Sequence, residues 1–219
     1  MPTLRYIAPG VHVADAPQRF YGVEVGARMT VLELDGGLLI HSPIAVDPAT
    51  VAHLGKPRWV LAPNKLHHLY VGPWAAAGLE AWAAPGLPKK RPDLRFQGEI
   101  TAAAASPFGG DVGLMPLACF GYTNEVALLH RPSRTLVVSD LVFNFPPTAP
   151  WLTRAAMRCL CAYPGCRTSL LERIGMRRSV ARSEVETLAQ WDFDRLIMAH
   201  GEVIETGGQA ALRRAFGWL

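Results

Sequence analysis

The sequence predicts a layered α/β fold in which helices cover the β-sheets. Short apolar runs bounded by turn-forming residues alternate with stretches of helical character. Their order is strands, helix, strand, helix, strands, helices, strand and helix, which is typical of layered α/β proteins. Because 50% of the residues are hydrophobic and no stretch has the composition of a linker, we expect residues 1–219 to form a single domain.

The first part of the chain predicts strands around one short helix. Asp35-Gly36-Gly37 separates two of the strands and is typical of a hairpin turn. Asp47 is placed to cap the start of the helix, and Gly55 lies just past its end. The expected elements are strands over 10–15, 29–34, 37–43 and 58–63 and a helix over 47–55.

The rest of the chain continues the same alternation. An Ala-rich helix beginning at residue 71 leads to a short strand around Trp82, and the Pro-, Gly- and Ala-rich stretch 86–111 predicts a loop. The region 150–190 has helical character, interrupted by "YPGC". The remaining expected elements are strands over 112–118, 125–130, 135–140 and 193–200 and a helix over 207–219.

Charge and cysteine content limit the classes of partner and compartment. The net charge is +4 and the basic residues are dispersed, so we expect a small-molecule substrate and no nucleic acid. No apolar run reaches about 18 residues, which argues against a membrane-spanning helix. The N-terminal residues do not resemble a secretory leader, and the cysteines suggest reduced thiols, so we expect a cytoplasmic protein. The cysteines are Cys119, Cys159, Cys161 and Cys166.

Three polar clusters each follow directly on a predicted strand. They are "NKLHH" with His67 and His68, Asp140 at the end of "TLVVSD", and His200 at the end of "RLIMAH". Ligand sites in α/β proteins collect beyond the ends of strands, so one pocket could gather all three clusters. Three imidazoles and a carboxylate are a common ligand set for zinc and also suit iron or manganese.

At these residues the sequence resembles the metallo-β-lactamase superfamily. More narrowly, "APNKLHH" and "MAHG" are similar to an uncharacterised, DUF4336-like branch of it. The resemblance covers nearly the whole chain and implies a four-layer αββα sandwich. It also implies a hydrolase-like metal site, in which the superfamily motif T-H-x-H-x-D-H is followed by a histidine, an aspartate and a last histidine.

The alignment with that motif implies that one of two metal sites has been lost. Pro63 and Lys65 stand at the first two motif histidines, and Tyr122, or alternatively Glu125, stands at the middle histidine. These three positions hold one ion in the superfamily. The positions that hold the other ion carry residues able to ligate. They are His67, His68, Asp140 and His200.

The resemblance therefore implies a mononuclear, metal-dependent hydrolase of esters, thioesters or phosphoesters, with zinc favoured over iron or manganese. Asp140 and Lys65 are the candidate catalytic residues, Lys65 supplying positive charge where the lost ion would lie. Three further residues could contact the ligands without binding the ion themselves, namely Glu125, Tyr122 and Asn64. The alternative is a non-catalytic or non-hydrolytic relative that binds a small ligand or a structural metal. The apolar segment 145–170 could form a lid or a homodimer contact.

Overall fold

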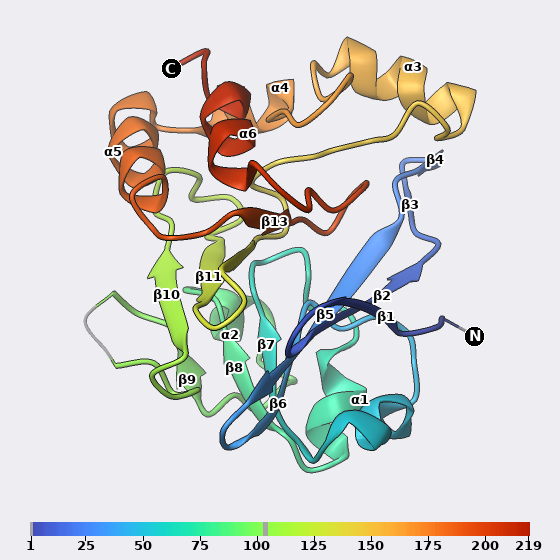
Figure 1. Ribbon diagram of the computed structural model, residues 1–219, viewed down its shortest axis with the longest axis vertical. Coiled ribbons are helices and arrows are strands. Elements are labelled where there is room, and N and C mark those ends of the chain that lie inside the picture. Colours follow the sequence, from blue (N-terminus) through green and yellow to red (C-terminus); the bar gives the residue numbers. More distant parts are fainter. Residues whose placement is uncertain (1, 103–104) are drawn as a thin grey trace.

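A computed structural model describes residues 2–102 and 105–219. Its larger sheet has seven strands in the order β1-β2-β5-β6-β7-β8-β9 (Figure 1). Neighbouring strands are antiparallel from β1 to β6 and parallel from β6 to β9. The strand bounds are β1 Arg5–Ala8, β2 Val11–Ala16, β5 Ala27–Leu34, β6 Gly37–His41, β7 Pro57–Ala62, β8 Glu80–Ala83 and β9 Gly98–Glu99.

The smaller sheet has four strands in the order β10-β11-β12-β13, and its last pair is parallel. A separate two-stranded hairpin, β3–β4, precedes β5. The bounds are β3 Arg19–Phe20, β4 Val23–Glu24, β10 Val112–Pro116, β11 Val126–His130, β12 Thr135–Val137 and β13 Arg195–Ile197. The helices are η1 Pro48–Leu54, α1 Val71–Ala76, α2 Leu87–Lys90, α3 Trp151–Cys159, α4 Leu170–Gly175, α5 Arg178–Leu188 and α6 Gly208–Ala215.

Alternating side chains along the strands create two kinds of core. Leu32 and Leu39 of the larger sheet share one buried cluster with Leu128 of the smaller sheet, so the two sheets pack face to face. Successive strand residues point to opposite faces of a sheet. Ile40, next to Leu39, accordingly packs on the outer side in a cluster that includes Trp74 of α1.

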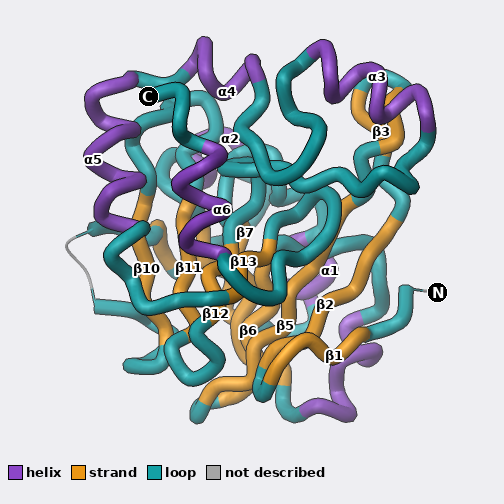
Figure 2. The backbone as a smooth tube through the Cα atoms, turned by 45° about the horizontal axis from the view of Figure 1, so that its top comes forward, coloured by secondary structure: helices purple, strands orange, loops and turns teal. Residues whose placement is uncertain are grey.

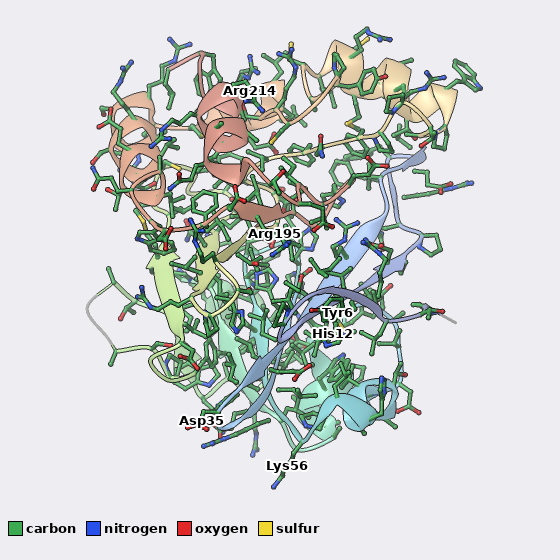
Figure 3. The ribbon with its side chains drawn as sticks, in the orientation of Figure 1. Tyr6, His12, Asp35, Lys56, Arg195 and Arg214 are labelled. Atoms are coloured by element: carbon green, nitrogen blue, oxygen red, sulfur yellow. The ribbon has the colours of Figure 1, made fainter. Side chains whose placement is uncertain are left out.

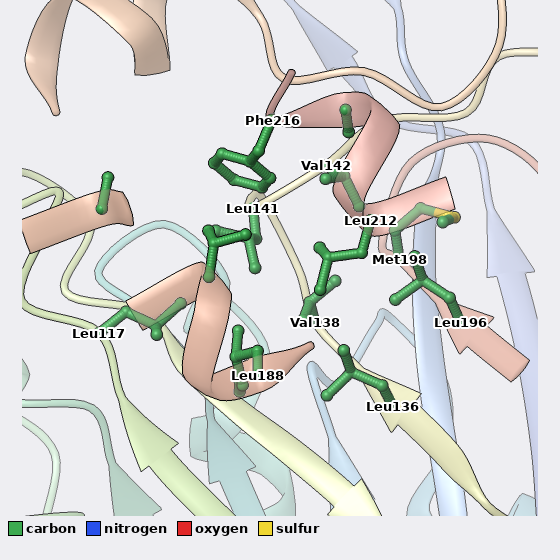
Figure 4. Close-up of a cluster of buried hydrophobic side chains, with 14 of the residues drawn as sticks. Leu117, Leu136, Val138, Leu141, Val142, Leu188, Leu196, Met198, Leu212 and Phe216 are labelled. Carbon is green, nitrogen blue, oxygen red and sulfur yellow. The ribbon is translucent and has the colours of Figure 1, made fainter. Parts of the chain in front are cut away.

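The outer face of the smaller sheet is covered in the same way. Leu188 of α5 and Leu212 of α6 lie over Leu136 and Leu196 (Figure 4). The order of layers is helix, sheet, sheet, helix. The predicted αββα sandwich is thus confirmed, with apolar clusters buried between the two sheets and between each sheet and its helices.

Most predicted elements are present, and the departures have local causes. Asp47 caps its helix as expected, accepting a hydrogen bond from Ala49 N at 2.8 Å, but η1 is a 3-10 helix. The stretch predicted as a loop over 86–111 contains α2 and β9, whose short, Pro- and Gly-rich sequences carry little periodicity. Within the described residues, no helix is long and apolar enough to cross a membrane.

His130, at the end of β11, gives the fold a testable pH dependence. It is buried, and Nδ1 lies 2.7 Å from Ser133 Oγ. Burial lowers the pKa of His130 below its usual value, because the charged form loses its hydration. His130 is therefore protonated more readily in the unfolded chain than in the folded protein, so the free energy of unfolding falls as the pH drops below about 6.5. We expect His130→Gln to lose less unfolding free energy than wild type between neutral and mildly acidic pH, measured by urea denaturation. Equal losses would contradict this account.

Candidate metal centre

Three side-chain atoms that could bind a metal ion, from three distant segments of the chain, lie close together. His67 follows β7, Asp140 follows β12 and His200 follows β13. Asp140 Oδ1 lies 3.3 Å from His67 Nε2 and 3.2 Å from His200 Nε2. The two Nε2 atoms are themselves 3.2 Å apart. The sequence placed these three residues together, and the structure brings them together.

The spacing and chemistry of these atoms fit a metal ion. Ligands arranged tetrahedrally around zinc at about 2.0–2.1 Å are about 3.3–3.4 Å from one another. The triangle formed by the three atoms, with sides of 3.2 and 3.3 Å, matches one face of such a tetrahedron. Two imidazoles and one carboxylate also form a suitable donor set for zinc, iron or manganese.

The other ring nitrogens hold the two imidazoles in orientation. His200 Nδ1 donates to the carbonyl oxygen of Gly26 at 2.8 Å, which leaves Nε2, on the side of Asp140, to carry a proton or to bind a metal ion. His67 Nδ1 lies 2.8 Å from Ser42 Oγ. Ser42 is buried and has a φ of 53°, an unfavourable conformation that aims its hydroxyl at the histidine. Phe143 stacks on the His200 ring with centroids 5.7 Å apart.

Asn64 links the histidine loop to the aspartate. Its Oδ1 accepts hydrogen bonds from the backbone nitrogens of Leu66 and His67 at 2.8 and 2.7 Å. Its Nδ2 donates to Asp140 Oδ2 at 2.7 Å and to Glu125 Oε2 at 3.3 Å. One buried side chain therefore fixes both the backbone that carries His67 and the second oxygen of Asp140.

Glu125 holds the backbone of Asp140 in place. Its carboxyl accepts hydrogen bonds from the backbone nitrogens of Ser139 at 2.6 Å and Asp140 at 2.7 Å. Burial, and then the negative charge of Asp140, raise the pKa of Glu125 to about 8. Glu125 thus acts on the backbone of Asp140, at a distance from the three ligating atoms.

The electrostatics of the site favour an anionic Asp140. Burial would raise the pKa of Asp140, but the charge of His67 and hydrogen bonds from both histidines outweigh it and hold the pKa below its usual range. Burial would lower the pKa of His200, yet the hydrogen bond and charge of Asp140 raise it overall. A proton and a metal ion therefore compete for the same Nε2 atoms, and either one neutralises the carboxylate.

His68, the fourth expected ligand, does not join the triangle. It is buried, and its Nδ1 accepts a hydrogen bond from Arg91 Nη1 at 2.9 Å. Burial, followed by the charges of Lys90 and Arg91, lowers its pKa and favours the neutral ring that can accept. The structure thus supplies three converging ligands where the sequence suggested four.

The side chains of Lys65 and Tyr122 form contacts within the loop around Gly121. Lys65 Nζ donates to the carbonyl oxygen of Gly121 at 3.1 Å, so its ammonium ties two loops together. Tyr122 is 71% exposed and packs its ring against Phe120. Ser42 and Phe143 are the site residues that the sequence analysis missed. Ser42 follows the strand end at His41, the same kind of position that identified the other three clusters.

Removing Asn64 is expected to weaken metal binding without removing a ligand. Asn64→Ala deletes the bonds that orient His67 and Asp140, and loss of such supporting bonds costs about 10–100-fold in metal affinity. Zinc competition titrations with a chromophoric chelator would measure the change. The control is Asn124→Gly, since the Asn124 side chain donates to Pro85 O and its φ of 49° suits glycine. Equal affinities of Asn64→Ala and Asn124→Gly would contradict the role given to Asn64.

The αββα architecture and the site at its strand ends define a protein of metallo-β-lactamase fold. A metallo-β-lactamase from Erythrobacter litoralis with β-mercaptoethanol in its active site aligns with a TM-score of 0.70 at 12% identity, covering 99% of this chain and 96% of that one. The DIM-1 metallo-β-lactamase exposed to ceftazidime gives 0.69 at 12% identity, covering 99% and 98%.

A third structure, the mono-zinc form of FIM-1 from Pseudomonas aeruginosa, gives a TM-score of 0.66 at 12% identity and covers 98% of this chain and 96% of its own. Identities this low establish a shared fold and leave activity open. Neither a family model nor a curated protein matches the sequence. The DUF4336-like branch therefore stays a prediction.

Proposed function

We propose that this protein is a metal-dependent hydrolase that holds one divalent ion between His67, Asp140 and His200. The observation that carries the proposal is the triangle of ligating atoms with sides of 3.2 and 3.3 Å. Zinc is the favoured ion, because two imidazoles and a carboxylate form its common three-ligand catalytic set. Iron and manganese accept the same donors.

Three protein ligands leave room for water or substrate, as in other catalytic zinc sites. An ion bound there would lower the pKa of water toward neutrality and polarise the oxygen of an ester, thioester or phosphoester. The chain's own groups preorganise this chemistry. Ser42 and the Gly26 carbonyl hold the rings of His67 and His200, and Asn64 holds Asp140. The three ligating side chains remain 7–12% exposed, which leaves access for a small molecule.

The alternative function is a non-hydrolytic relative that binds a small ligand or a structural ion. Two observations favour it. Lys65, at the position of a lost ligand, donates a hydrogen bond from its ammonium to the Gly121 carbonyl oxygen, and Tyr122 is exposed to solvent. Neither residue replaces the function of the second ion, so the remaining centre lacks the partner used in two-metal hydrolysis.

Metal loading followed by a substrate panel separates the two functions. Protein purified without chelator and loaded with zinc is expected to retain one equivalent and to hydrolyse at least one of an ester, a thioester and a phosphodiester. His67→Ala should lower that turnover by about a hundredfold or more. His53→Ala, which removes an exposed histidine from η1, is the matched control and should retain it.

The other outcomes decide against one or both of these functions. One retained equivalent without turnover on any of the three substrates would favour the non-hydrolytic relative. Retention below about a tenth of an equivalent of zinc, iron and manganese would contradict both metal-binding functions.

A further inference from the structure

The segment 151–178, from α3 to the first residue of α5, has an unusual charge. It contains six arginines and one glutamate, a net charge of +5 in a chain whose total is +4. Among the described residues, none of the six arginines forms an ion pair, whereas six arginines elsewhere do. The single acid, Glu172, is buried and accepts a hydrogen bond from Ser169. The arginines are Arg154, Arg158, Arg167, Arg173, Arg177 and Arg178.

The same segment exposes large apolar side chains. Of the ten large hydrophobic residues that are exposed in the described part of the chain, five belong to α3 and α4. Trp151 is 73% exposed and Ile174 is 75% exposed. Two more lie at the adjoining β3–β4 hairpin, where Tyr21 is 93% exposed. We call this surface the α3/α4 face; its apolar residues are Phe20, Tyr21, Trp151, Leu152, Leu170, Leu171 and Ile174.

The α3/α4 face is supported by the body of the protein, so its outer side chains are not needed for the core. Met157 and Tyr163 are buried in a small cluster with Phe145 beneath the helices. Thr153 Oγ1 donates to the carbonyl oxygen of Glu24 in the hairpin at 2.7 Å, which fixes α3 on β4. Figures 1 and 2 show α3, α4 and the hairpin together along one end of the molecule.

We propose that the α3/α4 face docks onto the surface of an anionic lipid bilayer. The negative surface potential of such a membrane attracts arginine side chains, while exposed Trp, Tyr, Leu and Ile side chains partition into the headgroup region. Tryptophan and tyrosine are the residues enriched at that depth. The protein would lie on the bilayer by this face and keep its sheets in water.

The charge distribution favours a lipid surface over a second copy of the chain. A two-fold dimer would place the same face of each subunit against the other, bringing two sets of unpaired arginines together. An anionic bilayer offers the opposite charge and an apolar layer beneath it. A nucleic acid would satisfy the arginines but would leave Trp151, Leu152 and Ile174 in water.

Vesicle co-sedimentation of the full-length protein tests the proposal. The probes are phosphatidylcholine vesicles with and without about 30% phosphatidylserine. We expect partitioning onto the anionic vesicles at low salt, weakened by about tenfold or more in about 0.5 M NaCl, because salt screens the arginines. Binding should be much weaker on phosphatidylcholine alone.

Two variants separate the charged and apolar contributions. Arg158→Glu/Arg167→Glu should lower partitioning by about tenfold or more, and Trp151→Ala/Ile174→Ser should lower it by a similar factor without changing its salt dependence. The matched controls are Lys56→Glu, at the opposite end of the molecule (Figure 3), and Tyr6→Ser on β1, where Tyr6 is 62% exposed. Both should bind as wild type does, and circular dichroism would verify that each variant is folded.

Absence of binding to anionic vesicles at low salt would overturn the proposal. So would equal binding by wild type and both face variants. Sedimentation velocity tests whether the face instead binds a second copy of the chain. That assignment would follow if the wild-type protein were a dimer that did not bind vesicles and if Trp151→Ala/Ile174→Ser converted it to a monomer. Such a dimer is the contact that the sequence suggested for segment 145–170.

Discussion

His67→Ala is expected to weaken zinc binding by about a thousandfold, whereas His68→Ala should leave the affinity within about tenfold of wild type. The two substitutions remove the same side chain from adjacent positions. His67 Nε2 lies 3.3 Å from Asp140 Oδ1 and 3.2 Å from His200 Nε2. His68 instead accepts from Arg91, so its loss removes a neighbouring hydrogen bond and no ligand.

Zinc affinity would be measured by competition with a chromophoric chelator, and thermal unfolding would be recorded for both variants. His68→Ala is expected to lose about 1–3 kcal/mol of stability, because the Arg91 donor loses a buried acceptor. If His68→Ala abolished zinc binding and His67→Ala retained it, the assignment of ligands would be wrong. Lys65→Ala should keep its zinc, since the Lys65 ammonium bonds to Gly121 O.

Gly201→Ala is expected to destabilise the protein by about 3–5 kcal/mol or to prevent folding. Gly201 follows His200 and has a φ of 93°, and a Cβ there would lie 2.2 Å from Asn144 O. The two backbones must approach closely, since Glu202 N donates to Asn144 O at 2.8 Å and Asn144 N to His200 O at 3.2 Å. A methyl group would push apart the two segments that follow Asp140 and His200, which are paired at Asn144 and Gly201.

Gly109→Ala is the matched control for this substitution. Gly109 has the same φ of 93°, but a Cβ at that position meets nothing within 4 Å. Its substitution should cost only the conformational penalty, about 1–2 kcal/mol. The difference between the two unfolding free energies, measured by urea denaturation, isolates the close backbone approach. Similar losses for both variants would show that this approach is unimportant.

The fold and part of the site follow from features visible in the sequence. Leu39 and Ile40, in one apolar run, bury on opposite faces of the same strand, and such runs predicted both sheets. His67, Asp140 and His200 each follow a strand, and strand ends gather ligand sites in α/β folds. The position of each residue directly after a predicted strand led to the expectation that one pocket could gather all three.

The orientation of adjacent histidines depends on hydrogen bonds that the sequence does not display. Asn64 accepts from the backbone nitrogens of Leu66 and His67, which tightens the loop and turns His67 toward Asp140. His68 N then donates to Leu66 O at 3.0 Å, and His68 points toward Arg91. Sequence spacing alone cannot assign which of two neighbouring imidazoles faces the ion.

Long-range polar contacts account for the other differences. Asn64 and Glu125 are 61 residues apart, yet they share hydrogen bonds around Asp140. Lys65 was predicted to supply charge to the site, but its backbone nitrogen bonds to Thr123 O and its ammonium to Gly121 O. These contacts depend on the packing of β7 against the loop before β11, which no local pattern encodes.

X-ray absorption spectroscopy of the zinc-loaded protein tests the central claim most directly. A single ion held by His67, Asp140 and His200 predicts one zinc per chain, two imidazole ligands and oxygen in the rest of the coordination shell. A zinc–zinc vector at about 3.5–4 Å would reveal a two-metal centre. That vector, a shell of three or more imidazoles, or sulfur ligands would contradict a mononuclear site formed by these three residues.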